Sequence, residues 1–377
     1  MRIIILHNTS DLYGASRILL FTAEALQTNG HQCIIVLSEE GLLTEELKKI
    51  NIEFKIIRLG ILRRKYFNVK GIINRIIVNK NAWIQLKRLI KEEKPDVIYS
   101  NTAGVLIGAL VAKSSNVKHF WHLHEIIIKP KLFTIFMGWL VNRYSDKVIV
   151  VSDAVKQHWV KYIDEKKLFR IYNGIKTDHF EISKSTLRQE LGIAEHEIIV
   201  TMIGRINHWK GQGYFLKIAS LICQKNKNVK FIMVGDPYQG NEHLLKELEQ
   251  TIMTLNLESK VVNLGYRTDI NHILLSADIF ISPSILPDPF PTVILEAMAS
   301  AKPIAATQHG GAKEMVLDGV TGFHIPINSA DKAAEIITKM INDKELRDQF
   351  GVAGKKRLNE LFSYQSFQIN LLQTISN

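Results

Sequence analysis

Residues 3–37 read IIILHNTSDLYGASRILLFTAEALQTNGHQCIIVL and decide the class of fold. Ile3–Leu6 and Cys33–Leu37 are short, continuous apolar runs, as expected of strands buried on both faces of a parallel sheet. Ala15–Asn29 lies between them with apolar residues at helical spacing, and Gly30 is a typical helix end. The stretch therefore predicts a strand, a helix and a second strand, the repeating unit of an open parallel sheet.

The same rhythm continues through both halves of the chain. Further strands are predicted at Val97–Tyr99, Val117–Trp121, Lys147–Val151, Ile198–Ile203, Phe231–Val234, Val261–Leu264, Ile279–Ser282 and Pro303–Ala305. The polar segment Lys176–Ser185 interrupts the rhythm and is typical of a linker. We therefore predict an α/β protein with two Rossmann-like domains, each a doubly wound parallel sheet, facing a central cleft. Residues 1–175 would form the first domain, residues 176–360 the second, and residues 361–377 a helix that packs back toward the first.

The composition of the 377 residues is that of a globular protein with two cores, since 46% of them are hydrophobic. No run of about 18 apolar residues is present, and Leu132–Val141 is too short to span a bilayer. The N-terminus reads as a buried strand and not as a signal peptide, so we expect a cytoplasmic protein. Cys33 and Cys223 each lie in an apolar pattern, which favours buried free thiols over a disulfide, a metal site or redox chemistry.

The net charge of +11 is concentrated between Lys55 and Lys94, where twelve Lys or Arg stand against two Glu. The segment holds Arg63-Arg64-Lys65 and the apolar, basic stretch Val69–Ile90. One helical face of that stretch would carry Ile72, Ile73, Ile76, Ile77 and Trp83. Such a segment, residues 55–94, suits an anionic lipid headgroup or a phosphorylated acceptor, which would place the protein peripherally on the inner face of the cell membrane. The alternative is the solvated face of an ordinary core helix. We expect no nucleic-acid partner, because neither aromatic stacking positions nor a known binding motif accompanies the charge.

Glycine spacing excludes two large classes of nucleotide-binding enzyme. Gly14 follows the first strand and Gly204 follows Ile198–Ile203, and neither begins a Gly-x-Gly-x-x-Gly fingerprint, which argues against a nicotinamide dehydrogenase. No glycine-rich turn ends in Gly-Lys-Ser or Gly-Lys-Thr, so a P-loop ATPase or kinase is excluded as well.

Two basic residues follow Gly204 at the edge of the predicted second sheet where ligands bind. Arg205 comes directly after the strand, and Lys210 opens the next helix together with Gly211. A guanidinium fork and an ammonium group can neutralise the charge of a diphosphate leaving group without a metal ion. The alternative is a pair of solvated basic residues in an ordinary loop.

Two carboxylates, Asp288 and Glu296, flank a proline-rich turn. Residues 282–291 hold too much proline for a helix, so Asp288 is expected on a loop, whereas Thr292 is expected to cap a helix whose first turn holds Glu296. The free N–H groups at that helix start favour a phosphate, and the carboxylates can accept hydrogen bonds from neutral hydroxyls. A helix cap beside a solvated surface charge would give the same pattern.

Together these motifs resemble the large retaining glycosyltransferase family 4, which has the two-domain GT-B fold. The similarity rests on Gly204-Arg205…Lys210-Gly211, Asp288…Glu296-Ala-Met-Ala-Ser, Tyr172–Phe180, Gly310-Gly311…Glu314, Asp318–Gly322, Gly14-Ala-Ser, His124-Glu125 and Val151-Ser152-Asp153. The resemblance implies transfer of a sugar from a nucleoside diphosphate, UDP by family habit, to a hydroxyl of a glycan or lipid-linked acceptor, in the synthesis of cell-surface polysaccharide or glycolipid. It also implies retention of anomeric configuration, no cofactor and no metal ion.

The resemblance further implies roles for single residues. Arg205 and Lys210 would hold the donor diphosphate, and Glu296 would accept the ribose hydroxyls. Asp288 would contact the transferred sugar, at a position where the family usually has Glu. The other donor contacts would come from Gly14, Gly204, Tyr266, Phe290, Pro291, Thr292 and Val293.

The family places a histidine beside the scissile bond, and His122 and His124 are both candidates. Alternation puts their side chains on one side of an extended segment, so spacing alone does not choose between them. Glu125 follows His124 as in the family, which favours His124. Two other functions fit the same fold: a sugar-nucleotide epimerase, and a non-catalytic, membrane-associated scaffold.

Overall fold

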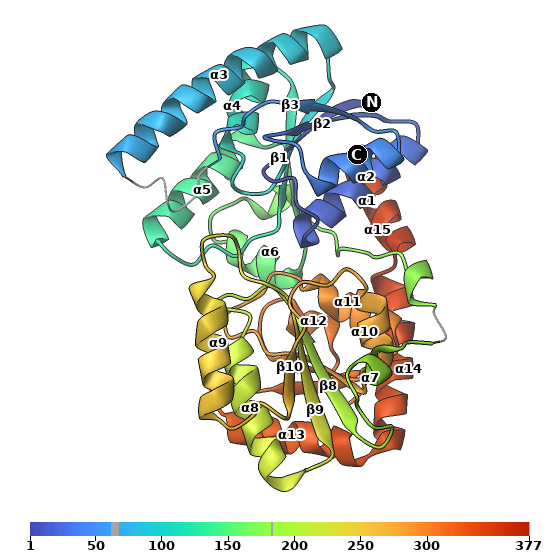
Figure 1. Cartoon of the computed structure of the whole chain (residues 1–377). Helices are drawn as coiled ribbons and strands as arrows, with labels where there is room; N and C mark the ends of the chain where they lie inside the picture. Colours follow the sequence, from blue (N-terminus) through green and yellow to red (C-terminus); the bar gives the residue numbers. More distant parts are fainter. Residues whose placement is uncertain (62–67, 182–183, 377) are drawn as a thin grey trace. The chain divides into compact units, whose positions relative to one another are not determined.

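The computed structural model describes residues 1–61, 68–181 and 184–376. Arg63, Arg64 and Lys65 of the predicted basic segment lie outside the described residues, as do two positions of the predicted linker. The chain forms two compact units (Figure 1). One comprises Met1–Asn173 with Tyr364–Asn377, and the other comprises Gly174–Ser363.

Seven parallel strands form the sheet of the first unit, in the order β3-β2-β1-β4-β5-β6-β7. They are β1 (Arg2–His7), β2 (Gln32–Leu37), β3 (Glu53–Ile56), β4 (Val97–Asn101), β5 (Lys118–Leu123), β6 (Lys147–Val150) and β7 (Leu168–Arg170). β1 pairs with β2 on one side and with β4 on the other. The strand order reverses at this point, as in a doubly wound sheet.

Helices cover both faces of this sheet. α1 (Gly14–Thr28), α2 (Leu42–Lys49) and α15 (Tyr364–Ser376) contribute to one apolar core, and α3 (Val69–Glu93) and α4 (Leu106–Ser115) contribute to the other. α5 (Lys131–Tyr144) packs beside α4, and α6 (Asp153–Trp159) follows β6. Figure 1 shows α3, α4 and α5 on one side of the first sheet and α1, α2 and α15 on the other.

The continuous apolar run of β1 follows from this arrangement. Ile3 and Ile5 lie in the core beneath α1, whereas Ile4 and Leu6 lie in the core beneath α3. Successive side chains of a strand point to opposite faces, so the part of β1 with a core on each face, Ile3–Leu6, is apolar at every position.

The basic stretch Val69–Ile90 forms one long helix, as predicted. The side chains of Ile72, Ile73, Ile76 and Ile77 are exposed on the side of α3 that faces away from the sheet. Trp83 differs from the prediction, because it packs against the core beneath α3 instead of joining the exposed isoleucines.

Six parallel strands form the sheet of the second unit, in the order β10-β9-β8-β11-β12-β13. They are β8 (Ile198–Ile203), β9 (Val229–Val234), β10 (Val261–Asn263), β11 (Ile279–Ser282), β12 (Ile304–Thr307) and β13 (Gly322–Ile325). β8 lies between β9 and β11, so the strand order reverses here as well.

The helices of the second unit again lie in two layers. α8 (Gln212–Lys225), α9 (His243–Thr254) and α13 (Ala330–Asn342) share one core, and α7 (Leu187–Glu190) and α10 (Ile270–Ser276) share the other. α11 (Thr292–Ala299) packs against α14 (Lys344–Leu361), and α12 (Ala312–Met315) follows β12. A short 3-10 helix, η3 (Asp178–Phe180), lies within the predicted linker.

The predicted strands are present, with ends that differ by at most two residues. The sequence did not indicate β3, β7 and β13, which lie at sheet edges. β3 exposes Glu53 and Lys55, and β7 ends in the exposed Arg170. An edge strand has one neighbour and less burial, so it lacks the continuous apolar run that marks a central strand.

Within the described ranges, no helix is both long enough and apolar enough to cross a bilayer. Cys33 and Cys223 are free, as predicted, but they are half-buried and not fully buried. Burial raises the pKa of both thiols, that of Cys33 to about 12. Neither thiol is therefore a ready nucleophile at neutral pH.

The C-terminal helix α15 belongs to the core of the first unit. Phe367, Leu371 and Ile375 lie in the same apolar cluster as the buried face of α1. The side-chain ammonium of Lys147, at the start of β6, donates to the carbonyl oxygen of Thr374 at 2.6 Å. The last element of the chain thus completes the first unit.

Leu371→Ala should lower the free energy of unfolding by about 3 kcal/mol, because the fully buried side chain leaves a cavity. Ile369, on the same helix, is 49% exposed and is the matched control. Ile369→Ala should cost less than about 1 kcal/mol. Urea denaturation of the full chain, followed by circular dichroism, measures both losses. Equal losses would contradict the packing of α15.

Candidate functional site

The turn after β8 is closed by one asparagine and one glycine. Asn207 Oδ1 accepts from the backbone N–H groups of Trp209 and Lys210 at 3.0 and 2.9 Å. Gly211 has a φ of +82°, and a Cβ atom there would lie 2.0 Å from the carbonyl oxygen of Pro283. Only glycine fits this position, so the turn presents Lys210 from a tightly constrained backbone at the carboxyl edge of the second sheet.

Lys210 reaches Asp288 from a neighbouring loop. β8 and β11 are hydrogen-bonded neighbours, so the loops that follow them start side by side. Lys210 Nζ lies 2.5 Å from Asp288 Oδ2, and the two side chains are 22% and 11% exposed. The predicted phosphate-binding cation and the predicted sugar-binding acid are therefore partners of each other, which the sequence did not indicate.

Two consecutive glycines after β12 hold the loop of Asp288. The N–H group of Gly311 donates to the carbonyl oxygen of Asp288 at 2.8 Å. Gly310 has a φ of +59°, and a Cβ atom there would lie 2.3 Å from the same oxygen. The pair Gly310-Gly311 thus permits a close backbone approach, a role that the sequence analysis did not assign to it.

The helix that carries Glu296 differs from the prediction in its cap residue and in the turn that holds Glu296. α11 begins at Thr292 with Pro291 as its N-cap, so Thr292 is the first helical residue and not the cap. Glu296 lies in the second turn instead of the first, and its side chain is buried. Thr292 and Val293 occupy the helix start, where backbone N–H groups have no carbonyl partner within the helix.

Phe290 is a packing residue of the same loop. Its side chain is buried and meets Phe362 edge-on, with ring centroids 5.7 Å apart. The ring therefore anchors the loop between Asp288 and α11 to the end of α14.

Arg205 follows β8 and lies beside Tyr238, an aromatic residue that was not predicted from the sequence. The guanidinium carbon of Arg205 lies 3.4 Å from the centroid of the Tyr238 ring, a stacked cation–π arrangement. Gln212 donates to the carbonyl oxygens of Gly204 and Arg205 at 3.3 and 3.0 Å. These contacts orient the guanidinium plane, whose edge carries N–H donors suited to a phosphate. Tyr266 follows β10 at the same edge and is 47% exposed.

Polar side chains also meet at the carboxyl edge of the first sheet. His124 Nε2 lies 3.0 Å from Asn101 Oδ1, and Asn101 Nδ2 lies 3.0 Å from His7 Nδ1. His7 Nε2 lies 3.0 Å from Ser16 Oγ, which donates to Asp11 Oδ1 at 3.0 Å. An amide oxygen only accepts, so the neutral His124 ring donates from Nε2 and keeps Nδ1 as its acceptor.

The structure separates the two candidate histidines. Their ring centroids are 4.1 Å apart, on one side of the extended segment as predicted. His122 is fully buried against the hydroxyl of Tyr99, whereas His124 is half-buried at the sheet edge. Burial lowers the pKa of His124 well below its ordinary value, and the neighbouring rings of His122 and His7 lower it further. Of these two, only His124 is accessible to a ligand, and its ring is neutral at physiological pH.

Glu125 entered the sequence analysis only as the neighbour of His124. Its carboxylate accepts from the backbone N–H groups of Ala103 and His124 at 3.1 and 3.0 Å. Burial raises the pKa of Glu125 to about 7, although these N–H groups oppose the shift. Thr102, next to Ala103, has a φ of +146°, a strained conformation for threonine. A shifted carboxylate beside a strained backbone is typical of a functional site.

The predicted residues thus fall into two groups. Gly14 is the first residue of α1, at the same edge of the first sheet as His124. The other predicted residues lie after β8, β10 and β11 of the second unit. Tyr238 and Asn101 join these groups without a sequence signal, because neither lies in a recognised motif. Glu125 belongs to the His124-Glu125 motif, but the sequence assigned it no role of its own.

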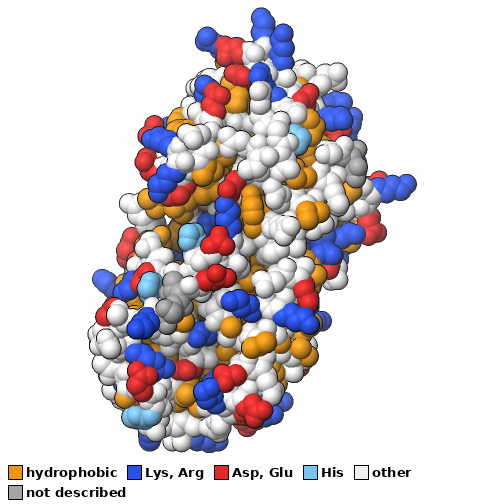
Figure 2. All heavy atoms as spheres, turned by 90° about the vertical axis from the view of Figure 1, so that its right-hand side faces the viewer, with side chains coloured by type: hydrophobic (Ala, Val, Ile, Leu, Met, Phe, Trp, Pro, Cys, Tyr) orange, Lys and Arg blue, Asp and Glu red, His pale blue; other side chains and the backbone are white. Residues whose placement is uncertain are grey.

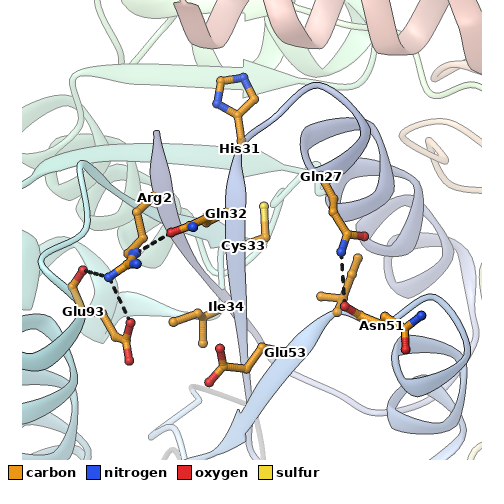
Figure 3. Close-up of a pocket in the computed structure, with 10 residues that line it drawn as sticks. Arg2, Gln27, His31, Gln32, Cys33, Ile34, Asn51, Glu53 and Glu93 are labelled. Carbon is orange, nitrogen blue, oxygen red and sulfur yellow. Dashed lines mark hydrogen bonds and ion pairs between the residues drawn. The ribbon is translucent and has the colours of Figure 1, made fainter.

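A polar pocket of about 320 Å³ lies at the opposite, amino edge of the first sheet (Figure 3). Arg2 donates to Gln32 Oε1 at 2.9 Å and to the carbonyl oxygen of Glu93 at 2.8 Å. These polar groups satisfy one another, and none of the predicted residues lines the pocket. Ligands of open parallel sheets bind at the carboxyl edge, so this pocket is not the candidate site.

Comparison with known families agrees with the geometry of both units. The family model described as Glycosyltransferase Family 4 matches residues 13–179, and the model described as Glycosyl transferases group 1 matches residues 183–357. The chain belongs to glycosyltransferase family 4. Its two parallel-sheet, Rossmann-like units are those of the GT-B fold, as predicted.

Curated relatives of this glycosyltransferase match it over most of its length. The UDP-Gal:alpha-D-GlcNAc-diphosphoundecaprenol alpha-1,3-galactosyltransferase of Escherichia coli is 27% identical over 350 residues, 89% of this chain and 86% of the relative. An alpha-1,4-N-acetyl-D-galactosaminyltransferase of Campylobacter jejuni, whose name includes PP-undecaprenol, is 25% identical over 367 residues, 96% of this chain and 94% of the relative. The crystal structure of Anabaena HepE in complex with UDP and glucose has a TM-score of 0.88 and 26% identity, and the match covers 100% of both chains.

The buried histidines of the glycosyltransferase predict a loss of stability in acid. Burial lowers the pKa of His7 and His119 to about 4 and that of His122 to about 3, below an unfolded value of 6.5. The unfolded chain therefore binds these protons first, so stability is present above about pH 6.5 and is lost as the pH falls toward about 4. Glu125 has the opposite effect, because its pKa is raised on folding. Between about pH 7 and about pH 4.5 the folded chain binds the Glu125 proton and the unfolded chain does not, which increases the stability as the pH falls.

We expect the free energy of unfolding to fall by roughly 3 kcal/mol between about pH 7 and about pH 5. Glu125→Gln removes the opposing proton and should make the fall steeper. Urea denaturation at a series of pH values measures both slopes. A stability that is constant over this range, or a shallower slope in Glu125→Gln, would contradict the assigned burial.

Proposed function

We propose that this glycosyltransferase transfers a sugar from a UDP-sugar to a hydroxyl group of a glycan or lipid-linked acceptor. The transfer retains the anomeric configuration, needs no metal ion or cofactor, and serves the synthesis of cell-surface polysaccharide or glycolipid. The observation that carries the proposal is the Lys210–Asp288 pair at the strand-order reversal of the second sheet, beside Arg205. The names of the E. coli and C. jejuni relatives and the UDP bound to HepE support the choice of donor and acceptor.

In this proposal the charges of Arg205 and Lys210 balance the donor diphosphate. The stacked guanidinium of Arg205 offers a planar fork, and Lys210 offers a point charge from its constrained turn. The N–H groups of Thr292 and Val293 at the start of α11 add a partial positive charge. Because both cations are fixed before the reaction, they stabilise the charge that grows on the leaving group.

The carboxylates of Glu296 and Asp288 accept hydrogen bonds from the hydroxyl groups of the donor. Glu296, buried in the second turn of α11, accepts the ribose hydroxyls, and Tyr266 lies against the base. Asp288 contacts the transferred sugar with the oxygen atoms that Lys210 leaves accessible. Its side chain is one methylene shorter than the usual Glu, and the N–H group of Gly311 holds its backbone. The depth at which the sugar binds is therefore set at this position.

The reaction proceeds on one face of the donor sugar. The bond from the anomeric carbon to the diphosphate oxygen breaks, and the acceptor oxygen forms its bond on the same side. The acceptor proton passes to the departing diphosphate, so no carboxylate nucleophile is needed. In the first unit, His124 accepts a hydrogen bond from a substrate hydroxyl at Nδ1, while Asn101 and Glu125 position the ring and its backbone.

The basic segment 55–94 suits an anionic surface or a phosphorylated acceptor. We therefore place the enzyme in the cytoplasm, peripherally on the inner face of the cell membrane. This location matches the acceptors of the two relatives, whose names place the sugar on diphosphoundecaprenol or PP-undecaprenol.

Lys210→Ala should lower kcat/KM for sugar transfer at least about a hundredfold, because one of the two cations that face the diphosphate is lost. Lys225→Ala, at the exposed end of α8, removes the same charge away from the site and should leave the rate unchanged. Product formation measured by mass spectrometry gives both rates, and thermal unfolding checks that both variants fold. Full turnover by Lys210→Ala would refute the phosphate role.

UDP-sugars should raise the thermal midpoint of the enzyme more than GDP-sugars or dTDP-sugars, because only the correct base completes the donor site. The best donor is then incubated with lipid-linked acceptors, and NMR of the product reports the anomeric configuration. Retention is the expected result, and inversion would contradict the same-face mechanism. An epimerised sugar from donor alone would indicate the epimerase function, and the absence of stabilisation by every nucleotide sugar would indicate a scaffold.

A further inference from the structure

Helix α5 carries an apolar stripe that faces outward. Leu132, Ile135, Phe136 and Trp139 recur at helical spacing and are 81%, 43%, 45% and 54% exposed. The rings of Phe136 and Trp139 stack with centroids 6.2 Å apart. A second stripe of the same helix is buried in the first unit. The helix is thus apolar on two sides, and packing within its own unit explains only one of them.

Helix α3 repeats this pattern in its first two turns. Val69, Ile72, Ile73 and Ile76 are 74%, 50%, 53% and 63% exposed. α4 packs against both α3 and α5, and its Leu110 is 38% exposed. We call these five residues, together with the four of α5, the apolar face.

Basic residues border the apolar face. Lys70, Lys80, Lys129, Lys131 and Arg143 are exposed on α3, on α5 or beside them. The stretch that holds α4 and α5, residues 97–145, contains a single acidic residue, the Glu125 of the polar cluster. Figure 2 views the molecule from another side, where Lys, Arg, Asp and Glu side chains are interspersed. The stretch around α4 and α5 lacks this mixture of charges.

The apolar face also lies near the polar cluster of the first unit. In a right-handed strand-helix-strand crossover each helix starts at the carboxyl edge of the sheet. α5 starts seven residues after His124, and α3 leads into β4, which ends at Asn101. The exposed stripes occupy the first turns of both helices. They therefore flank the edge at which His124 lies.

We propose that the apolar face docks the first unit on the surface of an anionic lipid bilayer, with Leu132, Phe136 and Trp139 entering the headgroup region. This inference rests on the proposed function, in which a membrane lipid carries the acceptor sugar. Aliphatic and aromatic side chains bordered by Lys and Arg match a boundary that is apolar within and negatively charged at its surface. A second copy of the chain matches less well, because a two-fold contact would bring the same cationic border against itself.

Docking in this manner gives the enzyme access to its acceptor. The lipid moiety stays in the bilayer, while its diphosphate and sugar extend into the headgroup region. The carboxyl edge with His124 then faces the layer in which the acceptor hydroxyl lies. Lys70 and Lys80 of α3 contribute charge to this surface, and the stripe of α5 contributes the larger aromatic side chains.

Vesicle binding of the full chain tests the inference without donor or acceptor. We expect binding to vesicles of phosphatidylcholine and phosphatidylglycerol in equal amounts, and about tenfold weaker binding to phosphatidylcholine alone. The triple variant Leu132→Ser, Phe136→Ser, Trp139→Ser should bind the mixed vesicles about tenfold or more weakly than the wild type. The matched control Val352→Ser, Ile369→Ser removes side chains that are 69% and 49% exposed on α14 and α15 and should bind as the wild type does.

Three outcomes would overturn the docking proposal. The first is no vesicle binding by the wild type, and the second is equal binding by the triple variant and the control. The third is a wild-type dimer, seen by light scattering, that the triple variant converts to a monomer, because the face would then belong to a second copy. Circular dichroism confirms that each variant is folded.

Thermal stabilisation by nucleotide sugars, measured on the same variants, separates this inference from the proposed function. Stabilisation by a UDP-sugar without vesicle binding overturns only the docking. Vesicle binding without stabilisation by any nucleotide sugar overturns the proposed donor site and leaves the docking surface in place.

Discussion

The parallel pairing of β8 with β11 is the constraint on which the candidate donor site depends. It places the carboxyl ends of two strands side by side, so that Lys210 and Asp288, 78 positions apart in the chain, lie 2.5 Å from each other. The pairing of β1 with β4 has the same effect in the first unit, where His7 and Asn101 are register partners. In both units the strand order reverses at these strands, and the loops that leave them carry the polar side chains.

Gly211, Gly310 and the Lys210–Asp288 ion pair all contribute to the contact between two loops of the second unit. Gly211 and Gly310 allow backbone contacts that a Cβ atom would prevent, and they hold the loops of Lys210 and Asp288 together. A largely buried ion pair contributes little net stability, because desolvation of the two charges offsets their attraction. We therefore attribute the pair to the function proposed here, in which a diphosphate shares the charge of Lys210.

The parts of the fold and site that could be predicted have local signals. Continuous apolar runs indicate the central strands. Arg205 and Lys210 are indicated by their position between a strand and a helix. Edge strands such as β3 and β13 lack such runs. Tyr238 and Asn101 could not be predicted as site residues, because the side chains that they contact belong to other strands or to the loops after them. The prediction for Thr292 was wrong because Pro291 occupies the cap position one residue earlier. Its ψ of +103° lies outside the helical range, and its carbonyl oxygen accepts from the N–H group of Ile294.

The sequence by itself determined the alternation of strands and helices, the family, and which charged groups are available, since apolar periodicity and turn residues act over a few positions. Only the tertiary structure decided that Lys210 pairs with Asp288, that His122 is enclosed while His124 reaches the edge, and that α15 completes the first unit. It also decided that α5 turns a second apolar stripe outward. The physical reason is that burial and charge pairing depend on which strands become neighbours, and distant segments of the chain decide that together.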